Sequence, residues 1–264
     1  MPFTFSHPVA VVCLNRWGLI LSALVVSSMA PDFPYFLFLS TQYQFGHTLP
    51  GIFFFDIPAG LMVLWVFHHF FKRPLLSLFP VTHQQGLMPL VNSFHFFPWR
   101  RFLLIILSLT IGAVTHIAWD SLTHQSGMVQ QLPILSLPII ENSAVSIKIY
   151  HMLQQGSGLL GITLLLGWYW KWLKQAPRLP AAATDSSNSQ WLILLIMGLM
   201  AVFLGGIYSF FNLDLGLDLY SFHLFIIKTV VVSIAIVLVE LTIFCALWHF
   251  KRSNKWTPLM SECD

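Results

Sequence analysis

Charged side chains are scarce in this chain: Asp, Glu, Lys and Arg make up 9% of its 264 residues, against roughly 25% in an ordinary soluble domain. The 13 Lys and Arg and 10 Asp and Glu residues cannot cover the surface of a soluble globule of this length. The three cysteines form neither a CxxC pair nor a zinc-finger spacing. These shortages argue against a soluble enzyme, a disordered protein, a disulfide-stapled secreted domain and a nucleic-acid binder.

Apolar residues, in contrast, account for 56% of the chain. A helix needs about 20 predominantly apolar residues to cross the hydrocarbon core of a bilayer. The sequence predicts an all-α, polytopic membrane helix bundle with five full spans, at Gly51–Phe71, Phe102–Leu122, Ile149–Trp172, Trp191–Phe211 and Phe225–Phe250. We expect a single membrane domain over residues 1–264, with a core over 1–174 and two additional spans over 191–250.

The apolar region Pro8–Leu39 is interrupted twice, by the sequences NRWG and APDFP. It predicts a helical hairpin or a broken span, in which Pro8–Asn15 packs antiparallel to Gly18–Met29. Such a hairpin would return His7 to the level of Asp32. In one straight helix the same two residues would lie about 37 Å apart, since each residue adds about 1.5 Å.

Lys and Arg indicate the orientation, because these residues are enriched in cytoplasmic loops. With the C-terminus on the cytoplasmic side, 11 of the 13 basic residues fall inward, and only Lys148 and Lys228 fall outward. The charge pattern therefore predicts an integral membrane protein with a cytoplasmic C-terminus.

Seven acidic and histidine residues from separate segments are predicted to gather at the outward face: Asp32, His47, Asp56, His116, Asp120, His124 and His151. Ionisable groups in a span are costly, and they usually face a wet cavity, a partner or a metal. The sequence therefore predicts one polar site rather than scattered polar contacts.

The strongest local pattern is GAVTHIAWDSLTH, at residues 112–124. On a helix, His116 and Asp120 share one face and lie about 6 Å apart along the axis. One imidazole and one carboxylate at this spacing can reach a single ion, and Zn²⁺ is commonly held by such ligands. His124 lies one turn further and is rotated by about 80° from His116. This position suits binding of a neighbouring ion or support of the ligands better than binding of the same ion.

Several segments carry a resemblance to a known family: MPFTFSHP, SMAPDFPYF, GHTLPG, FFFDIPAG and GAVTHIAWDSLTH. Together they resemble a bacterial membrane-protein family of unknown function, which is distantly similar to the LexA-regulated, membrane-bound, metal-dependent hydrolases. Asp32 matches an acid of that pattern, although the second Asp is missing, and His47 matches a loop histidine, although the preceding HRG is absent. His116 and Asp120 match the late HxxxD. The order of these residues after His7 is more remotely similar to that in zinc-dependent phospholipase C.

The resemblance implies a metal-dependent hydrolase at the outer face of the bacterial inner membrane. It would hold a divalent cation, with Zn²⁺ the expected metal, and act on a phosphoester of a lipid or lipid-linked substrate. The implied metal ligands are His7, Asp32, His47, His116 and Asp120. Asp56, His124 and His151 are implied as catalytic residues that orient the ligands or transfer protons. The expected partners are the bilayer and this substrate; no nucleic acid is expected.

Simpler interpretations remain open. His116 and Asp120 could hydrogen-bond across a helix interface. Asp56 could interact with a helix dipole, and His47 could be an ordinary loop residue. For the whole protein, the alternatives are a non-catalytic membrane scaffold and a transporter. A scaffold predicts polar residues scattered by helix packing, whereas a transporter predicts acids through the depth of the membrane and repeated halves.

Overall fold

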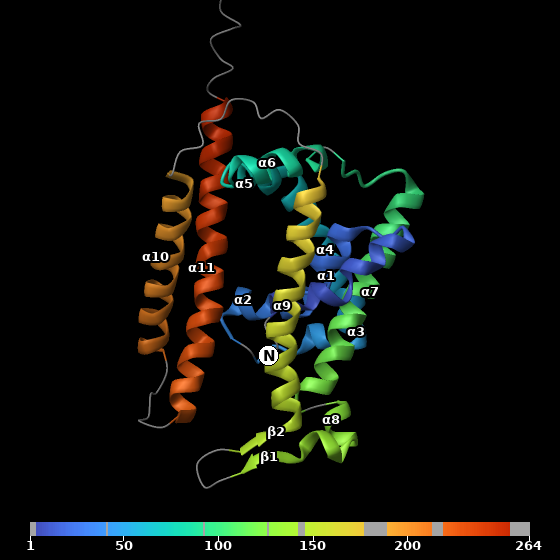
Figure 1. Cartoon of the computed structure of the whole chain (residues 1–264), viewed down its shortest axis with the longest axis vertical. Helices are drawn as coiled ribbons and strands as arrows, with labels where there is room; N and C mark the ends of the chain where they lie inside the picture. The colour runs from blue at the N-terminus through green and yellow to red at the C-terminus, as the bar shows by residue number, and fades with distance from the viewer. Residues whose placement is uncertain are drawn as a thin grey trace, which may run out of the picture. The chain divides into compact units, whose positions relative to one another are not determined.

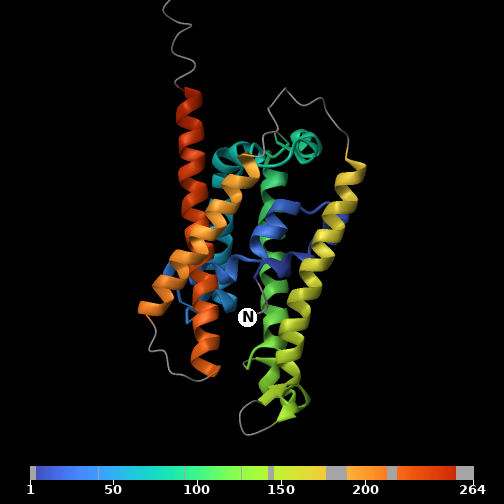
Figure 2. The same ribbon diagram turned by 60° about the vertical axis from the view of Figure 1, so that its left-hand side comes forward.

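The computed structural model describes residues 4–40, 42–91, 93–125, 127–141, 146–176, 189–212 and 219–253. The described chain is almost entirely helical (Figure 1, Figure 2). Five of its helical segments are long and apolar enough to cross a membrane: Leu21–Phe38, Leu49–Leu76, Trp99–Thr123, Gln190–Phe211 and Ser221–Arg252. The predicted all-α architecture with five spans is confirmed.

The identity of one span differs from the expectation. Leu21–Phe38, which lies within the region we expected to be broken, is among the five segments. The helix over the predicted span Ile149–Trp172 is present but is not among them. Its first half contains the sequence QQGSG, from Gln154 to Gly158, which lowers the hydropathy of this helix.

The chain divides into two compact units. Unit 1 comprises residues 1–33, 43–64 and 95–175, and unit 2 comprises residues 34–42, 65–94 and 176–264. The predicted separation of a core over 1–174 from two spans over 191–250 stays a prediction.

Unit 1 holds the N-terminal helical turns and two long helices. Its described elements are η1 (Thr4–Ala10), η2 (Val12–Trp17), α1 (Leu21–Ser27), η3 (Ala30–Asp32), η4 (Phe45–His47), α3 (Leu49–Gly51), η5 (Ile52–Asp56), α7 (Trp99–Thr123), α8 (Met128–Gln131), η8 (Pro133–Ser136), β1 (Pro138–Glu141), β2 (Ser146–Lys148) and α9 (Ile149–Gln175). The element η5 is a π-helix, and β1 pairs antiparallel with β2. α2 (Phe33–Phe38) and α4 (Ile57–Val66) each continue from unit 1 into unit 2.

The N-terminal segment folds back on itself. The chain leaves η2 through Gly18, whose φ of 82° is a left-handed conformation that glycine adopts without strain. The Thr4 hydroxyl donates a hydrogen bond of 2.5 Å to Asp32 Oδ2. This contact confirms the predicted return of the N-terminus to the level of Asp32, although η1 and η2 are 3-10 helices.

The helices α7 and α9 run antiparallel, side by side in both ribbon views (Figure 1, Figure 2). The Trp119 indole donates to Ser157 Oγ at 3.1 Å, and His124 Nε2 lies 3.4 Å from Gln154 Nε2. Because residue numbers rise in one helix as they fall in the other, the start of α7 and the end of α9 lie at the same end of unit 1.

Unit 2 contains the remaining helices, α5 (Lys72–Leu76), α6 (Val81–Leu87), α10 (Ser189–Phe211) and α11 (Leu219–Ser253), with the short turns η6 (Phe67–Phe71) and η7 (Met88–Leu90). α10 packs along α11 (Figure 1). His249 Nε2 donates to the Phe70 carbonyl oxygen at 2.9 Å, which joins α11 to η6. Gln190 Nε2 likewise donates to the Ser77 carbonyl oxygen.

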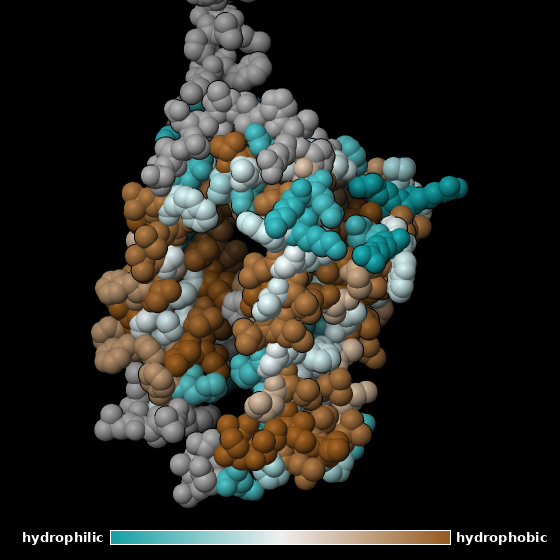
Figure 3. Space-filling view, viewed as in Figure 1, coloured by the Kyte–Doolittle hydropathy of each residue, from teal (hydrophilic) through white to brown (hydrophobic). Residues whose placement is uncertain are grey.

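The surfaces of both units carry many large apolar side chains. Hydrophobic residues cover much of the visible face of α9 in unit 1 and of α10 in unit 2 (Figure 3). Leu159 on α9 is 74% exposed, and Phe203 on α10 is 66% exposed. Exposed apolar surface of this extent is unfavourable in water and is expected for helices that contact lipid, which indicates a membrane protein.

Candidate metal centre

Four side chains of unit 1 converge on one point. Asp32 ends η3, His47 ends η4, and His116 and Asp120 lie in α7. Each offers one ligand atom, and these four atoms all lie within 4.8 Å of one another. The side chains of Asp32 and His116 are 2% and 0% exposed, and those of His47 and Asp120 are 17% and 10% exposed. The described residues thus contain a largely buried cluster of two imidazoles and two carboxylates that could hold a metal ion.

The separations within the cluster are short and similar. His47 Nε2 lies 3.3 Å from Asp32 Oδ1 and 3.4 Å from Asp120 Oδ2. His116 Nε2 lies 3.6 Å from Asp32 Oδ1 and 3.4 Å from Asp120 Oδ2. Each imidazole nitrogen therefore faces both carboxylates, with room between the four atoms for one small ion.

A backbone carbonyl fixes the orientation of the His116 ring. His116 Nδ1 lies 2.7 Å from the carbonyl oxygen of Ser28. A carbonyl oxygen only accepts hydrogen bonds, so Nδ1 carries the proton and donates. In the neutral ring Nε2 then presents its lone pair to Asp32 and Asp120. A lone pair that faces two carboxylates is unfavourable unless a positive charge lies between them.

Gly112, one turn before His116, lets α1 approach α7 closely enough for this bond. A Cβ atom at this position would lie 2.7 Å from the Leu24 carbonyl oxygen and 2.9 Å from the Ser28 amide nitrogen. The Ser27 hydroxyl also donates to the Leu109 carbonyl oxygen, so α1 and α7 are joined by polar as well as steric contacts. The close packing places the Ser28 carbonyl against the histidine.

Gly46 brings the other two ligands together in the same way. A Cβ atom at Gly46 would lie 2.8 Å from the Pro31 carbonyl oxygen, so only glycine allows η4 to pack on η3. Thr48 then caps the next helix, because its hydroxyl oxygen accepts a 3.0 Å hydrogen bond from the Gly51 amide. The residues on either side of His47 therefore fix the turn that presents its ring to Asp32.

Several polar atoms of the cluster make no hydrogen bond. Among the described residues, Asp32 Oδ1, His116 Nε2 and Asp120 Oδ1 are buried and have no hydrogen-bond partner. Buried polar atoms are almost always hydrogen-bonded, and each exception calls for a cause such as an ion or a water. Asp32 is instructive, because Oδ2 accepts from Thr4 whereas Oδ1 points into the cluster without a donor. A cation between the four ligand atoms would satisfy Asp32 Oδ1 and His116 Nε2, whereas Asp120 Oδ1 faces His7.

His7 lies beside the four-residue cluster rather than within it. Its ring stacks on the His116 ring, with the centroids 3.9 Å apart, and its Nε2 lies 3.6 Å from Asp120 Oδ1. Burial, together with the neighbouring His116, lowers the pKa of His7 to about 4, so the ring is neutral near pH 7. The structure thus brings the predicted ligand His7 to Asp120, on the carboxylate oxygen that the other ligands leave free.

The imidazole of His47 responds to the two carboxylates. Burial lowers the pKa of His47, but the nearby carboxylates of Asp120 and Asp32 outweigh burial and raise the pKa above its ordinary value. The electrostatic environment at this ring therefore favours a positive charge.

Asp56, predicted as a catalytic residue, is fully buried at the end of the π-helix η5. Neither of its carboxylate oxygens has a hydrogen-bond partner among the described residues. A Cβ atom on Gly46 would lie 3.1 Å from Asp56 Oδ1, so Asp56 lies against the turn that precedes His47. Single π-helical turns within α-helices frequently occur at functional sites.

The other two predicted catalytic histidines differ in position. His124 Nδ1 lies 3.6 Å from Asp120 Oδ2, and its side chain is 30% exposed; burial lowers its pKa. His151 instead makes a local contact at the start of α9, where its Nδ1 accepts a 3.2 Å hydrogen bond from the Lys148 amide. The catalytic role of both residues stays a prediction.

Three residues that support the site were not singled out from the sequence. Thr4 donates to Asp32, the Ser28 carbonyl accepts from His116, and Gln154 lies 3.4 Å from His124 Nε2. Thr4 and Asp32 are 28 positions apart in the sequence, and Ser28 and His116 are 88 positions apart. A contact with a backbone carbonyl also does not depend on the type of side chain at that position. No local sequence signal identifies such partners.

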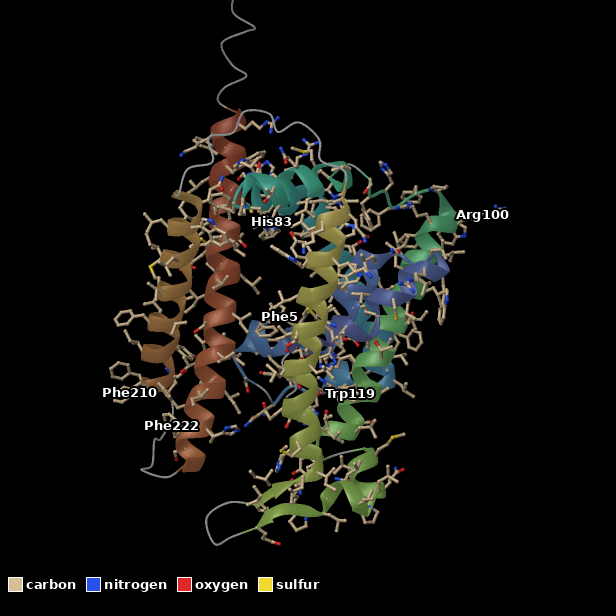
Figure 4. All side chains as sticks on the ribbon, viewed as in Figure 1. Phe5, His83, Arg100, Trp119, Phe210 and Phe222 are labelled. Carbon is tan, nitrogen blue, oxygen red and sulfur yellow. The ribbon has the colours of Figure 1, made fainter. Side chains whose placement is uncertain are left out.

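The cluster lies far along α7 from the basic start of that helix. Figure 4 labels Arg100 near one end of α7 and Trp119, which precedes Asp120, towards the other end. Twenty residues separate Arg100 from Asp120, which corresponds to about 30 Å along a helix axis. Lys171 and Lys174, near the end of the antiparallel helix α9, lie at the same end of unit 1 as Arg100.

Comparison with known proteins gives a family and no assigned function. The family model described as "Domain of unknown function (DUF4184)" matches residues 1–246. No curated protein matches the chain, and no solved structure matches it. The match agrees with the predicted uncharacterised family. The resemblance to the LexA-regulated hydrolases and to zinc-dependent phospholipase C stays a prediction from motifs.

Proposed function

This chain belongs to the DUF4184 family, a domain of unknown function, and we propose that it is a membrane-embedded, metal-dependent hydrolase. The observation that carries the proposal is the convergence of Asp32, His47, His116 and Asp120 from three separate elements on one buried point. Burying two carboxylates together is costly unless a positive charge, from a metal ion or a protonated imidazole, lies between them. A divalent cation offsets this cost through direct coordination.

The distances favour Zn²⁺ as the ion. Zinc binds His nitrogen and carboxylate oxygen at about 2.0–2.2 Å, usually with tetrahedral geometry. Ligands at this distance on the corners of a tetrahedron are about 3.3–3.6 Å apart. The four distances between an imidazole nitrogen and a carboxylate oxygen in the cluster run from 3.3 to 3.6 Å. Four of the six separations among the ligand atoms therefore fit tetrahedral zinc, and the other two are at most 4.8 Å.

Neighbouring residues would hold the ligands in place. The Ser28 carbonyl fixes the His116 tautomer, and the Thr4 hydroxyl orients Asp32. Such partners raise the affinity of a metal site by about 10- to 100-fold. Zinc bound here would supply Lewis acidity, polarising a phosphoryl oxygen and activating water.

The two carboxylate oxygens of Asp120 face different histidines. Its Oδ2 faces His47 and His116, whereas its Oδ1 lies 3.6 Å from His7 Nε2. The four-residue cluster would hold the first ion, and His7 with Asp120 Oδ1 would hold a second, weaker ion. Asp56 and the partly exposed His124 are the candidates for proton transfer to and from the reacting groups.

The same proposal gives the location and the substrate class. The basic ends of α7 and α9 would face the cytoplasm of a bacterial inner membrane, and the cluster would lie toward the outer face. The C-terminus would then be cytoplasmic. A metal site at this depth suits a phosphoester of a lipid or of a lipid-linked compound.

A non-catalytic membrane scaffold is the second candidate, because four protein ligands are also the number found in structural zinc sites. Hydrolysis needs a further position for water, which zinc provides when it expands to five ligands. The partial exposure of His47 and His124 leaves access for that water.

A hydrolysis assay separates the two candidates. The full chain, purified in detergent and loaded with Zn²⁺, is expected to hydrolyse bis(p-nitrophenyl) phosphate, to lose activity with a chelator and to regain it with zinc. Asp120→Asn should lower the rate by roughly 100-fold or more, whereas Glu141→Gln, in the exposed strand β1, should not. A zinc-loaded wild-type chain without phosphoesterase activity on this ester or on phospholipid vesicles would favour the scaffold.

A further inference from the structure

An apolar cavity lies in unit 1 between η1, α7 and α9. Its volume is about 440 Å³, within the range of roughly 300–1,000 Å³ that is usual for ligand sites. Its wall is made mainly of apolar side chains: Val9 and Ala10 from the N-terminal turns, Ala118 and Leu122 from α7, and Leu160 and Leu164 from α9. The wall therefore favours an apolar ligand.

The polar groups in the wall are largely satisfied within the chain. The Thr115 hydroxyl donates to the Gly112 carbonyl oxygen at 2.8 Å. The Trp119 indole donates to Ser157 Oγ, and the Ser157 hydroxyl donates to the Gln154 carbonyl oxygen. A polar ligand would lose its water in this cavity and gain few hydrogen bonds, whereas a hydrocarbon loses nothing.

One residue joins the cavity to the candidate metal centre. His7 lines the cavity, and its Nε2 lies 3.6 Å from Asp120 Oδ1. His7 Nε2 is buried on the side of the cluster, so only the His7 ring separates the end of a ligand that lies at His7 from the Asp120 carboxylate. A molecule that fills the cavity and reaches the cluster must be apolar along most of its length and polar at one end.

The cavity is continuous with the apolar exterior of the same helices. Leu160 and Leu164 line the cavity and are also 59% and 52% exposed. Trp119, labelled in Figure 4 on α7 beside α9, lines it as well and is partly exposed. Since α7 is one of the candidate membrane spans, a hydrocarbon chain can enter from the bilayer without crossing water.

We propose that this cavity binds one hydrocarbon chain of a membrane amphiphile, with its polar end at His7 beside the metal centre. The identity of the polar end as a phosphoester rests on the proposed function, whereas binding of the chain rests on the cavity alone. The volume suits a single chain. The cavity would act as the site that selects lipid-linked substrates over water-soluble phosphoesters.

Photo-crosslinking tests this proposal on the full chain in phosphatidylcholine nanodiscs. The probe is a lysophosphatidylcholine with a diazirine midway along its acyl chain, and the adducts are mapped by mass spectrometry. We expect adducts on cavity residues such as Val9 and Leu160. Ala118→Phe, which fills the cavity, should lower the yield there by roughly tenfold, the factor for losing burial of about two methylene groups.

Val114→Phe is the matched control, because Val114 lies one turn earlier on α7, is 45% exposed and does not line the cavity. It should leave the yield in the cavity unchanged. If Ala118→Phe does not fold, Leu164→Trp fills the same space from α9. Adducts spread over Val114 and the cavity alike, unaffected by either filling variant, would show ordinary bilayer contact and overturn the proposal.

Zinc content, measured on the same samples, separates this test from that of the metal site. His116→Ala should lose zinc yet keep the adducts in the cavity. Ala118→Phe should keep zinc and lose the adducts. Zinc binding without adducts in the cavity of the wild-type chain would overturn the chain-binding proposal and leave the metal site standing.

Discussion

His116 Nδ1 donates a 2.7 Å hydrogen bond to the carbonyl oxygen of Ser28, and this bond decides which ring nitrogen faces the carboxylates. The two residues are 88 positions apart, and they meet because α1 packs tightly on α7. The tautomer that the bond selects presents a lone pair to Asp32 and Asp120, as a metal ligand requires.

The packing of α1 on α7 should therefore control the metal site. In Gly112→Ala the new Cβ would meet the backbone of Leu24 and Ser28 at 2.7 and 2.9 Å, so the helices must separate. We expect a loss of about 1–3 kcal/mol in the free energy of unfolding and weaker zinc binding. Gly167→Ala on α9 is the control, since its Cβ would meet open space. Equal stability and zinc affinity for both variants would contradict this role for Gly112.

Thr4 should contribute to metal affinity without touching the ion. Thr4→Val keeps the shape of the side chain but removes the hydroxyl that donates to Asp32 Oδ2. We expect the zinc dissociation constant, measured by chelator competition, to rise by about 10- to 100-fold. Thr110→Val, which removes a hydroxyl bonded only to the Ile106 carbonyl of its own helix, should leave it unchanged. A similar change in both variants would argue against an orienting role for Thr4.

Zinc affinity should fall as the pH falls. Zinc binds the neutral imidazole, so it must displace any proton from His47. Because the carboxylates raise the pKa of His47, this competition begins at a higher pH than for an ordinary histidine. Zinc titrations at pH 8, 7 and 6 should give progressively weaker binding; equal or tighter binding at pH 6 would contradict the assignment.

In the metal-free protein, His47 should stabilise the folded state more at low pH than at high pH. A raised pKa means that the folded state binds the His47 proton more tightly than the unfolded state does. The stability from His47 is therefore fully present below its unfolded pKa and is lost as the pH rises through the folded pKa. Thermal unfolding of the chelated wild type and of His47→Gln, compared across this range, measures the contribution.

His7 should be dispensable for the first ion. Its Nε2 lies 3.6 Å from Asp120 Oδ1, whereas His47 and His116 face Asp120 Oδ2, and the four-residue group is complete without His7. We expect His7→Ala to retain zinc in that group and to lose only a second, weaker ion. Complete loss of zinc in this variant, with folding intact by circular dichroism, would mean that His7 is a ligand of the first ion.

The sequence predicted the features that depend on local pattern. Helical spacing placed His116 and Asp120 on one face, and the apolar runs predicted the long helices. The motif resemblance added Asp32 and His47, which the structure brings to the same point. The interruptions in the first apolar region predicted that the N-terminus folds back.

Other features depend on contacts that no local pattern encodes. The roles of Thr4 and Ser28 arise from residues far apart in sequence, and Gly46 and Gly112 matter only because backbones approach there. Our expectation of a span over Ile149–Trp172 gave too little weight to the polar residues of α9, such as Gln154, which lower its hydropathy below that of the candidate spans. Tertiary packing decides the roles of Thr4, Ser28, Gly46 and Gly112.

Metal content per chain tests the central claim most directly. Wild-type protein, freed of metal, reloaded with Zn²⁺ and passed through a desalting column, should retain at least one ion by mass spectrometry. Asp32→Ala, His47→Ala, His116→Ala and Asp120→Ala should each retain well below one, and His83→Ala, outside the cluster, should match the wild type. A wild-type chain that retains no zinc, or four cluster variants that retain as much as the wild type, would contradict the account.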